Sequence, residues 1–295
     1  MLDANQEKEL GIFECLDLHQ EGGTLWITMN RPKAKNALNR KMVEEIEGLV
    51  DKLKPRLDIR VVILRGSGGH FCSGGDVKEM FLARNMECKE GEPDPISSLN
   101  RMFGRLVSKL YELPQTLIVA VEGAAMGGGL GLVCAADIVL ATASARFQLP
   151  ETSLGIIPAQ ITPFLLERLG MAKTRRLALT GMSLDGKQAE QYGLVDICCQ
   201  NRADLDEEIR KLRRQILKTA PLASRQTKQL ILGIAQQDFD QILDKGAALF
   251  ADAVRSGEGQ EGIVSFTEQR PARWSQEIWA DVGENYLKMI LNKPE

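Results

Sequence analysis

Residues 124–132 read Ala-Ala-Met-Gly-Gly-Gly-Leu-Gly-Leu and join a predicted strand to a predicted helix. The apolar run at residues 117–121 is typical of a buried strand, and residues 130–136 have helical character. Three consecutive glycines at this junction let another group approach the main chain closely, because no Cβ is present. They also leave N–H groups unpaired at the positive end of a helix, which suits an anionic oxygen. Taken alone, the run is equally compatible with close packing of the helix on the sheet.

A second glycine-bearing junction lies earlier in the chain. Residues 60–66 (Arg-Val-Val-Ile-Leu-Arg-Gly) read as a buried strand, and residues 71–80 (Phe-Cys-Ser-Gly-Gly-Asp-Val-Lys-Glu-Met) lead into a helix. Two parallel strands that end in such turns bring main-chain N–H groups together at their carboxyl ends, where open α/β sheets bind ligands. Two convergent donors form an oxyanion hole, which stabilises an enolate or a tetrahedral oxyanion. The pair of junctions therefore predicts an oxyanion site.

The composition is that of an ordinary globular protein with one large core: 295 residues, 44% hydrophobic and 26% charged. The formal net charge of -3 gives no reason to expect a nucleic acid or an anionic membrane as a partner. The polar N-terminal residues and the lack of a long apolar run predict a cytoplasmic protein with reduced cysteines. Two histidines and six scattered cysteines offer no zinc-binding spacing, so no metal site is expected.

Several reaction classes are disfavoured by absent motifs. A Ser-His-Asp triad would have to use His19 or His70, and no Gly-x-Ser-x-Gly elbow supplies the serine. We interpret His70 as a loop residue beside the ligand site rather than as a general base. The phosphate-loop and dinucleotide-binding fingerprints are also missing.

The patterning predicts alternating strands and helices followed by an almost wholly helical tail. Strands are predicted at residues 13–18, 24–29, 61–64, 117–121 and 137–142, and helices at residues 39–53, 98–113, 130–136, 174–180, 185–192, 205–219, 222–235, 238–255 and 260–269. Residues 87–95 are rich in polar residues and helix breakers, which predicts a flexible loop. We therefore expect an α/β core in residues 1–204 and a helical region in residues 205–295, without an independent second domain. Apolar residues from Trp274 to Ile290 recur about every four positions and predict one more amphipathic helix.

Several motifs that follow one another along the chain resemble those of a known protein family. They occupy residues 29–39 (Met-Asn-Arg-Pro-Lys-Ala-Lys-Asn-Ala-Leu-Asn), 71–76, 123–137, 149–158, 178–181 and 189–195. On these motifs the chain resembles the crotonase (enoyl-CoA hydratase/isomerase) superfamily over residues 12–274. The resemblance implies a crotonase-like spiral of ββα repeats with a C-terminal helical region for oligomerisation and pocket cover. It also implies homotrimers or dimers of trimers, an acyl-CoA thioester substrate, and no cofactor beyond the coenzyme A that the substrate carries.

The resemblance also implies roles for particular residues. The oxyanion donors carried over from the family are the N–H groups of Gly75 and Gly128. The implied substrate-binding residues are Lys33, Ala34, Lys35, Ser73, Gly74, Asp76, Gly127 and Gly131. Lys33 or Lys35 could contact the phosphates of coenzyme A, although either is equally compatible with a solvated turn lysine.

The catalytic carboxylates depart from the pattern of the best-known hydratases, which carry two glutamates. In this chain the first position is Gly131, and the second is Glu151 after Pro150. The apolar residues around this glutamate predict desolvation and a raised pKa, which suits proton transfer; they are Phe147, Leu149, Leu154, Ile156 and Ile157. The resemblance further implies that the N–H of Ala159 helps to hold the reacting water.

The combination of Gly131, the Pro150-Glu151 pair and residues 158–163 (Pro-Ala-Gln-Ile-Thr-Pro) resembles one branch of the superfamily. That branch hydrates 3-substituted glutaconyl-CoA esters, such as isohexenylglutaconyl- and 3-methylglutaconyl-CoA, in leucine and terpene breakdown. A second carboxylate on such a substrate needs a cation. Arg101 and Arg105, one helical turn apart, are candidates, and they fit a solvated helix face equally well.

Two other functions remain open. A Δ3,Δ2-enoyl-CoA isomerase could use the single glutamate as a proton shuttle between two carbons. A noncatalytic acyl-CoA-binding or RNA-associated protein could keep the same fold, since fold does not fix activity. Glu151 together with both glycine turns favours an enzyme, and the negative net charge disfavours RNA.

Overall fold

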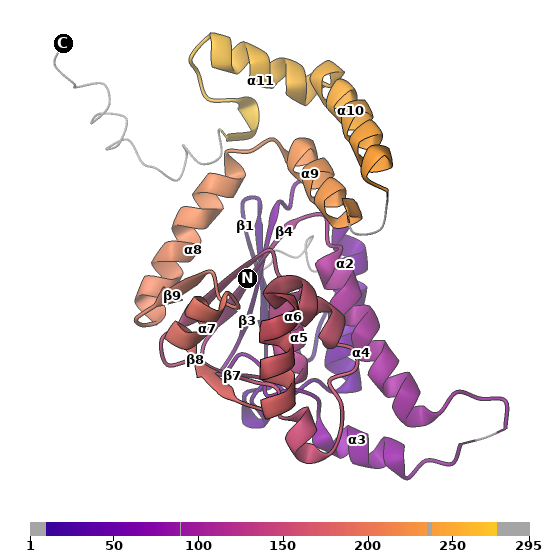
Figure 1. Ribbon diagram of the computed structural model, residues 1–295. Coiled ribbons are helices and arrows are strands. Elements are labelled where there is room, and N and C mark those ends of the chain that lie inside the picture. The colour runs from indigo at the N-terminus through magenta and orange to yellow at the C-terminus, as the bar shows by residue number, and fades with distance from the viewer. Residues whose placement is uncertain (1–9, 89, 235–237, 276–295) are drawn as a thin grey trace.

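The computed structural model describes residues 10–88, 90–234 and 238–275 (Figure 1). In these segments no helix combines the length and the apolar character needed to cross a bilayer. The chain forms an α/β core, and its C-terminal helices extend from one end of that core (Figure 1).

The larger sheet has six strands in the order β1-β2-β3-β4-β6-β9. They are β1 (Leu16–Glu21), β2 (Thr24–Met29), β3 (Val61–Gly66), β4 (Thr116–Val121), β6 (Ile138–Thr142) and β9 (Ile197–Cys199). The first two pair antiparallel, and all the other neighbours pair parallel. Strands β3 and β4 are continuous runs of buried apolar residues, which is typical of a parallel sheet covered on both faces.

A smaller sheet contains β5 (Ala124–Met126), β7 (Arg146–Gln148) and β8 (Ser183–Asp185). The chain passes from β4 to β5 and then into α5 (Gly128–Cys134). It then passes from β6 to β7, and after η2 (Glu151–Leu154) into α6 (Thr162–Thr180). This repeated passage from the large sheet to the small one and into a helix confirms the predicted spiral of ββα units. The short strands were not predicted, because three residues are too few to show an alternating pattern.

Three helices lie between β2 and β4 in the chain: α2 (Arg40–Leu53), α3 (Val77–Arg84) and α4 (Pro95–Tyr111). Helix α4 contacts the other two. The predicted start of α2 is confirmed, because the Asn39 side chain accepts a hydrogen bond from the Met42 N–H and so caps the helix. Helix α4 buries one apolar face that includes Met102, Leu106 and Leu110.

Some predicted boundaries were wrong. Strand β1 lies at Leu16–Glu21 rather than at residues 13–18. Helix α6 begins at Thr162 rather than at residue 174, and it consists of two helical pieces that meet at Gly170, whose φ is 71°. That break interrupts the period of 3.6 residues and hides the first piece from a pattern search.

The C-terminal part comprises α7 (Gly186–Tyr192), α8 (Arg202–Leu217), α9 (Pro221–Gly233), α10 (Phe239–Arg255) and α11 (Gly257–Thr267). Helix α8 packs on the large sheet through Leu205 and Ile209. Lys228 joins α9 to the core through its Nζ, 2.6 Å from an Asp137 oxygen, and burial lowers the pKa of this lysine. The amphipathic helix predicted beyond Trp274 falls almost entirely outside the described residues.

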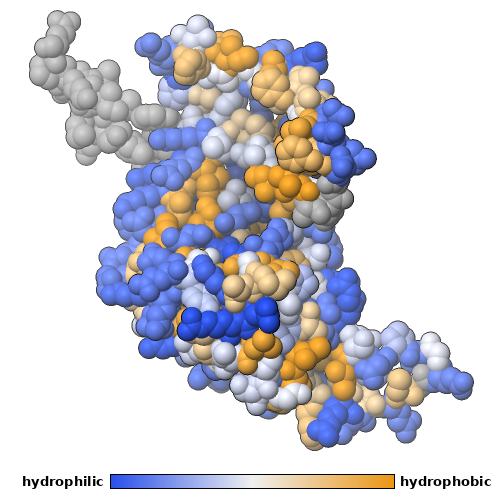
Figure 2. Space-filling view, viewed as in Figure 1, coloured by the Kyte–Doolittle hydropathy of each residue, from blue (hydrophilic) through white to orange (hydrophobic). Residues whose placement is uncertain are grey.

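Helices α10 and α11 carry several apolar side chains on their outer surface (Figure 2). Phe250 is 73% exposed and Phe266 is 86% exposed. Phe239, Leu243 and Ile263 are also exposed. Several exposed apolar side chains on neighbouring helices are typical of an interaction surface.

Candidate active site

The two glycine junctions meet in space. The Cys72 N–H donates to the Ala124 carbonyl at 2.8 Å, and the Met126 N–H donates to the Cys72 carbonyl at 2.9 Å. A Cβ placed on Gly128 would lie 3.5 Å from the Gly75 nitrogen. The residues that follow β3 and β4 therefore run side by side, as the rule for parallel strands predicts.

Both predicted oxyanion donors lack a partner. Gly128 is the first residue of α5, so its N–H has no acceptor within the helix. Gly75 sits in a bridge where the Gly74 carbonyl and the Asp76 N–H bond to Leu38, which leaves the Gly75 N–H outside the pairing. Neither N–H donates to a protein acceptor in the described part of the chain. Two neighbouring donors are thus available to one ligand oxygen.

Two further glycines allow this close approach. Gly74 and Gly127 have φ values of 101° and 48°, which side-chain-bearing residues rarely adopt. A Cβ on Gly74 would lie 3.0 Å from the Met126 carbonyl oxygen, and one on Gly127 would lie 2.8 Å from Oε1 of Glu151. Substitution at either position would displace the main chain or the carboxylate.

Glu151 is the first residue of η2 and lies against Gly127. Its Oε2 is buried and has no hydrogen-bond partner among the described residues. Burial raises the pKa of this carboxyl, in the predicted direction. The predicted cause is only partly right, because Phe147 and Leu149 are buried whereas Leu154, Ile156 and Ile157 are exposed. An unpaired, desolvated carboxyl beside two free N–H donors is suited to proton transfer.

An aromatic ring closes the site beside Gly131. A Cβ on this glycine would lie 3.1 Å from Phe103 Cζ and 3.2 Å from Ile161 Cγ1. A Cβ on Gly128 would lie 3.4 Å from the same Phe103 atom. Phe103 therefore fills the space where a second carboxylate would stand. Phe103 could not be assigned to the site from the sequence, because its position fits an ordinary member of the apolar face of α4.

We expect the Gly131→Glu variant to gain no hydration of crotonyl-CoA and to unfold at a lower temperature. The added side chain meets Phe103 and Ile161, and overpacking of this kind costs about 1–3 kcal/mol of folding free energy. The double variant Phe103→Ala/Gly131→Glu removes the contact with Phe103. It should recover part of the thermal stability and hydrate crotonyl-CoA faster than Phe103→Ala alone. Faster hydration by the single Gly131→Glu variant would contradict the steric role of Phe103.

The lysine-bearing turn lies beside the oxyanion donors. Lys33 and Ala34 belong to η1 (Pro32–Ala34), and Lys35 follows with a φ of 49°. The Ser73 N–H donates to the Lys35 carbonyl at 3.0 Å, and the Ser73 hydroxyl donates to the Ala34 carbonyl at 3.2 Å. Both lysine side chains are exposed. The structure thus places this turn next to the donors, and phosphate contact remains a prediction.

Three other candidates have structural partners. The Asp76 side chain accepts from the Lys78 N–H and lies 3.0 Å from Arg31, so it caps α3 and forms an ion pair. His70 Nδ1 accepts from the Ala124 N–H at 3.3 Å, consistent with a loop residue. The Ala159 N–H donates to the Ile157 carbonyl at 2.8 Å, and its contact with the reacting water remains a prediction.

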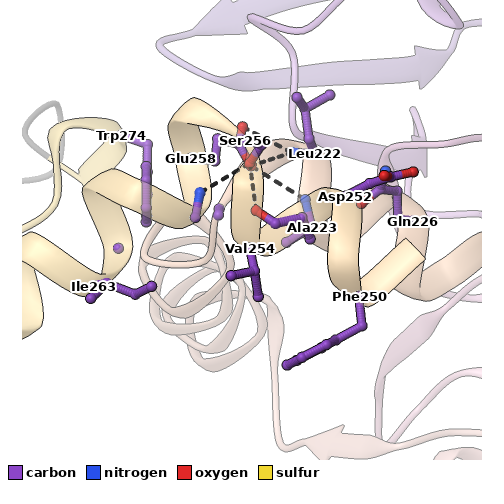
Figure 3. Close-up of a pocket in the computed structure, with 14 residues that line it drawn as sticks. Leu222, Ala223, Gln226, Phe250, Asp252, Val254, Ser256, Glu258, Ile263 and Trp274 are labelled. Carbon is purple, nitrogen blue, oxygen red and sulfur yellow. Dashed lines mark hydrogen bonds between the residues drawn. The ribbon is translucent and has the colours of Figure 1, made fainter. Parts of the chain in front are cut away.

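A separate hollow lies among the C-terminal helices (Figure 3). Its walls include the apolar side chains of Leu222, Phe250, Ile263 and Trp274. The Glu258 carboxylate at its edge accepts hydrogen bonds from the N–H groups of Leu222 and Ala223, the second and third residues of α9. The hollow is lined by no residue of the glycine turns or of the segment that carries Glu151.

Comparison with known proteins decides the family. The model of the enoyl-CoA hydratase/isomerase family matches residues 19–277. The chain belongs to the enoyl-CoA hydratase/isomerase family. This membership confirms the predicted crotonase relationship and indicates enoyl-CoA hydratase or isomerase activity on an acyl-CoA.

Several known proteins resemble the chain over most of its length. Human mitochondrial methylglutaconyl-CoA hydratase is 32% identical over 260 residues, which cover 86% of this chain and 74% of the human protein. The structure of AtuE from Pseudomonas aeruginosa is 40% identical with a TM-score of 0.85, covering 89% of this chain and 100% of AtuE. An enoyl-CoA hydratase/isomerase from Marinobacter aquaeolei is 39% identical with a TM-score of 0.86, covering 88% and 99%.

Proposed function

We propose that this protein is an enoyl-CoA hydratase that adds water to a 3-substituted glutaconyl-CoA, such as isohexenylglutaconyl- or 3-methylglutaconyl-CoA. The observation that carries the proposal is the buried, unpartnered Oε2 of Glu151 beside the N–H groups of Gly75 and Gly128. The likeness to human methylglutaconyl-CoA hydratase supports this substrate class.

In the proposed reaction the thioester oxygen accepts hydrogen bonds from Gly75 and Gly128. Ionised Glu151 takes a proton from water while the water oxygen bonds to the β-carbon. The electrons of the double bond move toward the thioester, and the resulting enolate oxygen is stabilised by the two N–H donors. Glu151 then returns the proton to the α-carbon, so that one carboxyl serves as base and then as acid. Its raised pKa suits both roles.

The surroundings support an acyl group with an apolar branch. Met80 Sδ lies 3.8 Å from the position of a Cβ on Gly75. Helix α3 continues from Met80 with Phe81 and Leu82, which are 62% and 64% exposed. We propose that this apolar surface accepts the 3-substituent and that Lys33 and Lys35 contact the phosphates of coenzyme A.

We further propose a homotrimer, or a dimer of trimers, in the cytoplasm. The exposed apolar side chains of α10 and α11 and the hollow beside them support assembly through the C-terminal helices (Figures 2 and 3). Burial of this surface against another subunit would remove a large apolar area from water.

An isomerase is the second candidate, and the same observation favours it. A single carboxyl can take a proton from the carbon between a Δ3 double bond and the thioester and return it two carbons further along. The two N–H donors stabilise the dienolate in the same way. Gly131 and the adjacent Phe103 leave no carboxylate at the first of the two glutamate positions of the best-known hydratases, and this proton transfer needs one carboxyl only.

A substrate panel separates these functions. We expect purified protein to hydrate 3-methylglutaconyl- and isohexenylglutaconyl-CoA with higher kcat/KM than crotonyl-CoA, and not to shift the double bond of 3-enoyl-CoA. Chromatography of the products distinguishes water addition from double-bond migration. Double-bond migration without hydration would overturn the hydratase in favour of the isomerase. A thermal shift with CoA esters but no turnover of any of them would favour a binding protein.

A further inference from the structure

Helix α4 has a notch in its surface at Gly104, where no side chain is present. This residue is buried in the middle of the helix, where glycine is less favourable than alanine by roughly 1 kcal/mol. A Cβ at this position would lie 2.7 Å from Cδ of Gln160, with the Gln160 Oε1 closer still. The missing side chain thus makes room for the Gln160 amide, which reaches α4 from the segment that begins at Glu151.

The side-chain amide of Gln160 also contacts Arg101. Oε1 of Gln160 accepts a hydrogen bond from Arg101 Nη1 at 3.5 Å, and this Nη1 lies 3.0 Å from the Cβ position at Gly104. Arg101 is exposed, and it forms no ion pair within the described segments. A guanidinium carries five N–H donors, so most of its donors remain open to a ligand.

This arginine borders the wall of the acyl site. Phe103 and Ile161 form that wall against Gly131, and they are the chain neighbours of Gly104 and Gln160. The contact between Gln160 and Arg101 is exposed to solvent, and each of its two segments also carries one side chain of the apolar wall.

We propose that Arg101, held by Gln160 in the notch at Gly104, binds the distal carboxylate of the acyl group and selects dicarboxylic over monocarboxylic enoyl thioesters. This inference rests on the proposed function and assigns it a specificity-determining residue. The planar guanidinium can donate two parallel hydrogen bonds to a carboxylate, which gives direction as well as charge. Gln160 acts as a positioning residue that restricts the orientation of the guanidinium.

The test compares two esters that differ only in the distal carboxylate. 3-Methylglutaconyl-CoA carries a carboxymethyl group where 3-methylcrotonyl-CoA carries a methyl group. For each enzyme the discrimination ratio is kcat/KM for the first ester divided by kcat/KM for the second. We expect Arg101→Met to lower this ratio by roughly 10- to 100-fold, the value of a charge-assisted hydrogen bond. Arg101→Lys should lower it less, because the charge remains and the parallel hydrogen bonds do not.

Arg105→Met is the matched control. Arg105 lies one turn further along α4 and is equally exposed, and no hydrogen bond joins it to Gln160 in the described structure. Its substitution should leave the ratio unchanged, whereas Gln160→Ala should lower the ratio without shifting the pH dependence of turnover. Thermal unfolding of each variant checks that the fold is retained.

The possible outcomes separate this inference from the proposed function. A wild-type ratio well above one that falls in Arg101→Met and not in Arg105→Met supports the assignment of Arg101. If wild-type protein discriminates but Arg101→Met keeps its ratio, the proposed function stands and the role of Arg101 is wrong. An equal loss for both esters also overturns the role of Arg101. Wild-type activity on neither ester overturns the proposed function itself, and this inference with it.

Discussion

Glu151→Gln is expected to lose turnover by about 1,000-fold or more while it binds the CoA ester almost as well as the wild type. The amide keeps the size of the side chain but can neither take a proton from water nor return one, and general acid-base catalysis contributes roughly 100- to 10,000-fold. Single-turnover rates measure the loss of chemistry, and calorimetric titration measures affinity.

The control for this variant is Glu92→Gln, which changes an exposed carboxylate on the loop before α4. It should leave both turnover and affinity at wild-type values. Undiminished turnover in Glu151→Gln would remove Glu151 from the mechanism. A matched loss in Glu92→Gln would point instead to a general effect of charge.

The second large effect is expected at Gly128. Gly128→Pro deletes one oxyanion donor and should slow turnover by roughly 100-fold or more. Position 128 is the first residue of α5, where proline is tolerated because its missing N–H has no helical acceptor. Steady-state kinetics measure the effect, and circular dichroism checks the fold.

Gly128→Ala separates loss of the donor from steric disturbance. Alanine keeps the N–H but introduces a Cβ 3.3 Å from Leu38 Cδ1 and 3.4 Å from Phe103 Cζ. We expect it to lose much less activity than Gly128→Pro. Equal losses in the two variants would assign the effect to crowding, and normal kinetics in a folded Gly128→Pro would exclude this donor.

The main features of the fold and the meeting of the two glycine turns could be predicted from the sequence. Parallel strands bring their carboxyl ends to one edge of the sheet, so the approach of Gly75 to Gly128 follows from topology. The direction of the pKa shift of Glu151 was also predictable. The exposure of Ile156 and Ile157 was not predictable, because a run of apolar residues does not show which of its side chains face the carboxyl.

Contacts between segments that lie far apart in the chain could not be predicted from the sequence patterns. Phe103 contacts the space beside Gly131 across two helices, and Gln160 enters α4 at Gly104 from 56 positions further along the chain. Helical periodicity places each residue on a face of its own helix but does not identify what packs there. The hydrogen bond from the Ala159 N–H to Ile157 depends on a tight local turn that the motif match did not anticipate.

The unpartnered carboxyl of Glu151 also links acidity to folding. Burial raises its pKa above the ordinary value of 4.5, so between these two values the folded chain holds a proton that the unfolded chain releases. The contribution of this group to the free energy of unfolding therefore decreases as pH rises through that interval. Once ionised, this carboxylate is an anion in a poorly hydrated place, and the same group is the one that can exchange a proton with a bound thioester. Resistance to unfolding and capacity for chemistry thus oppose each other at a single side chain.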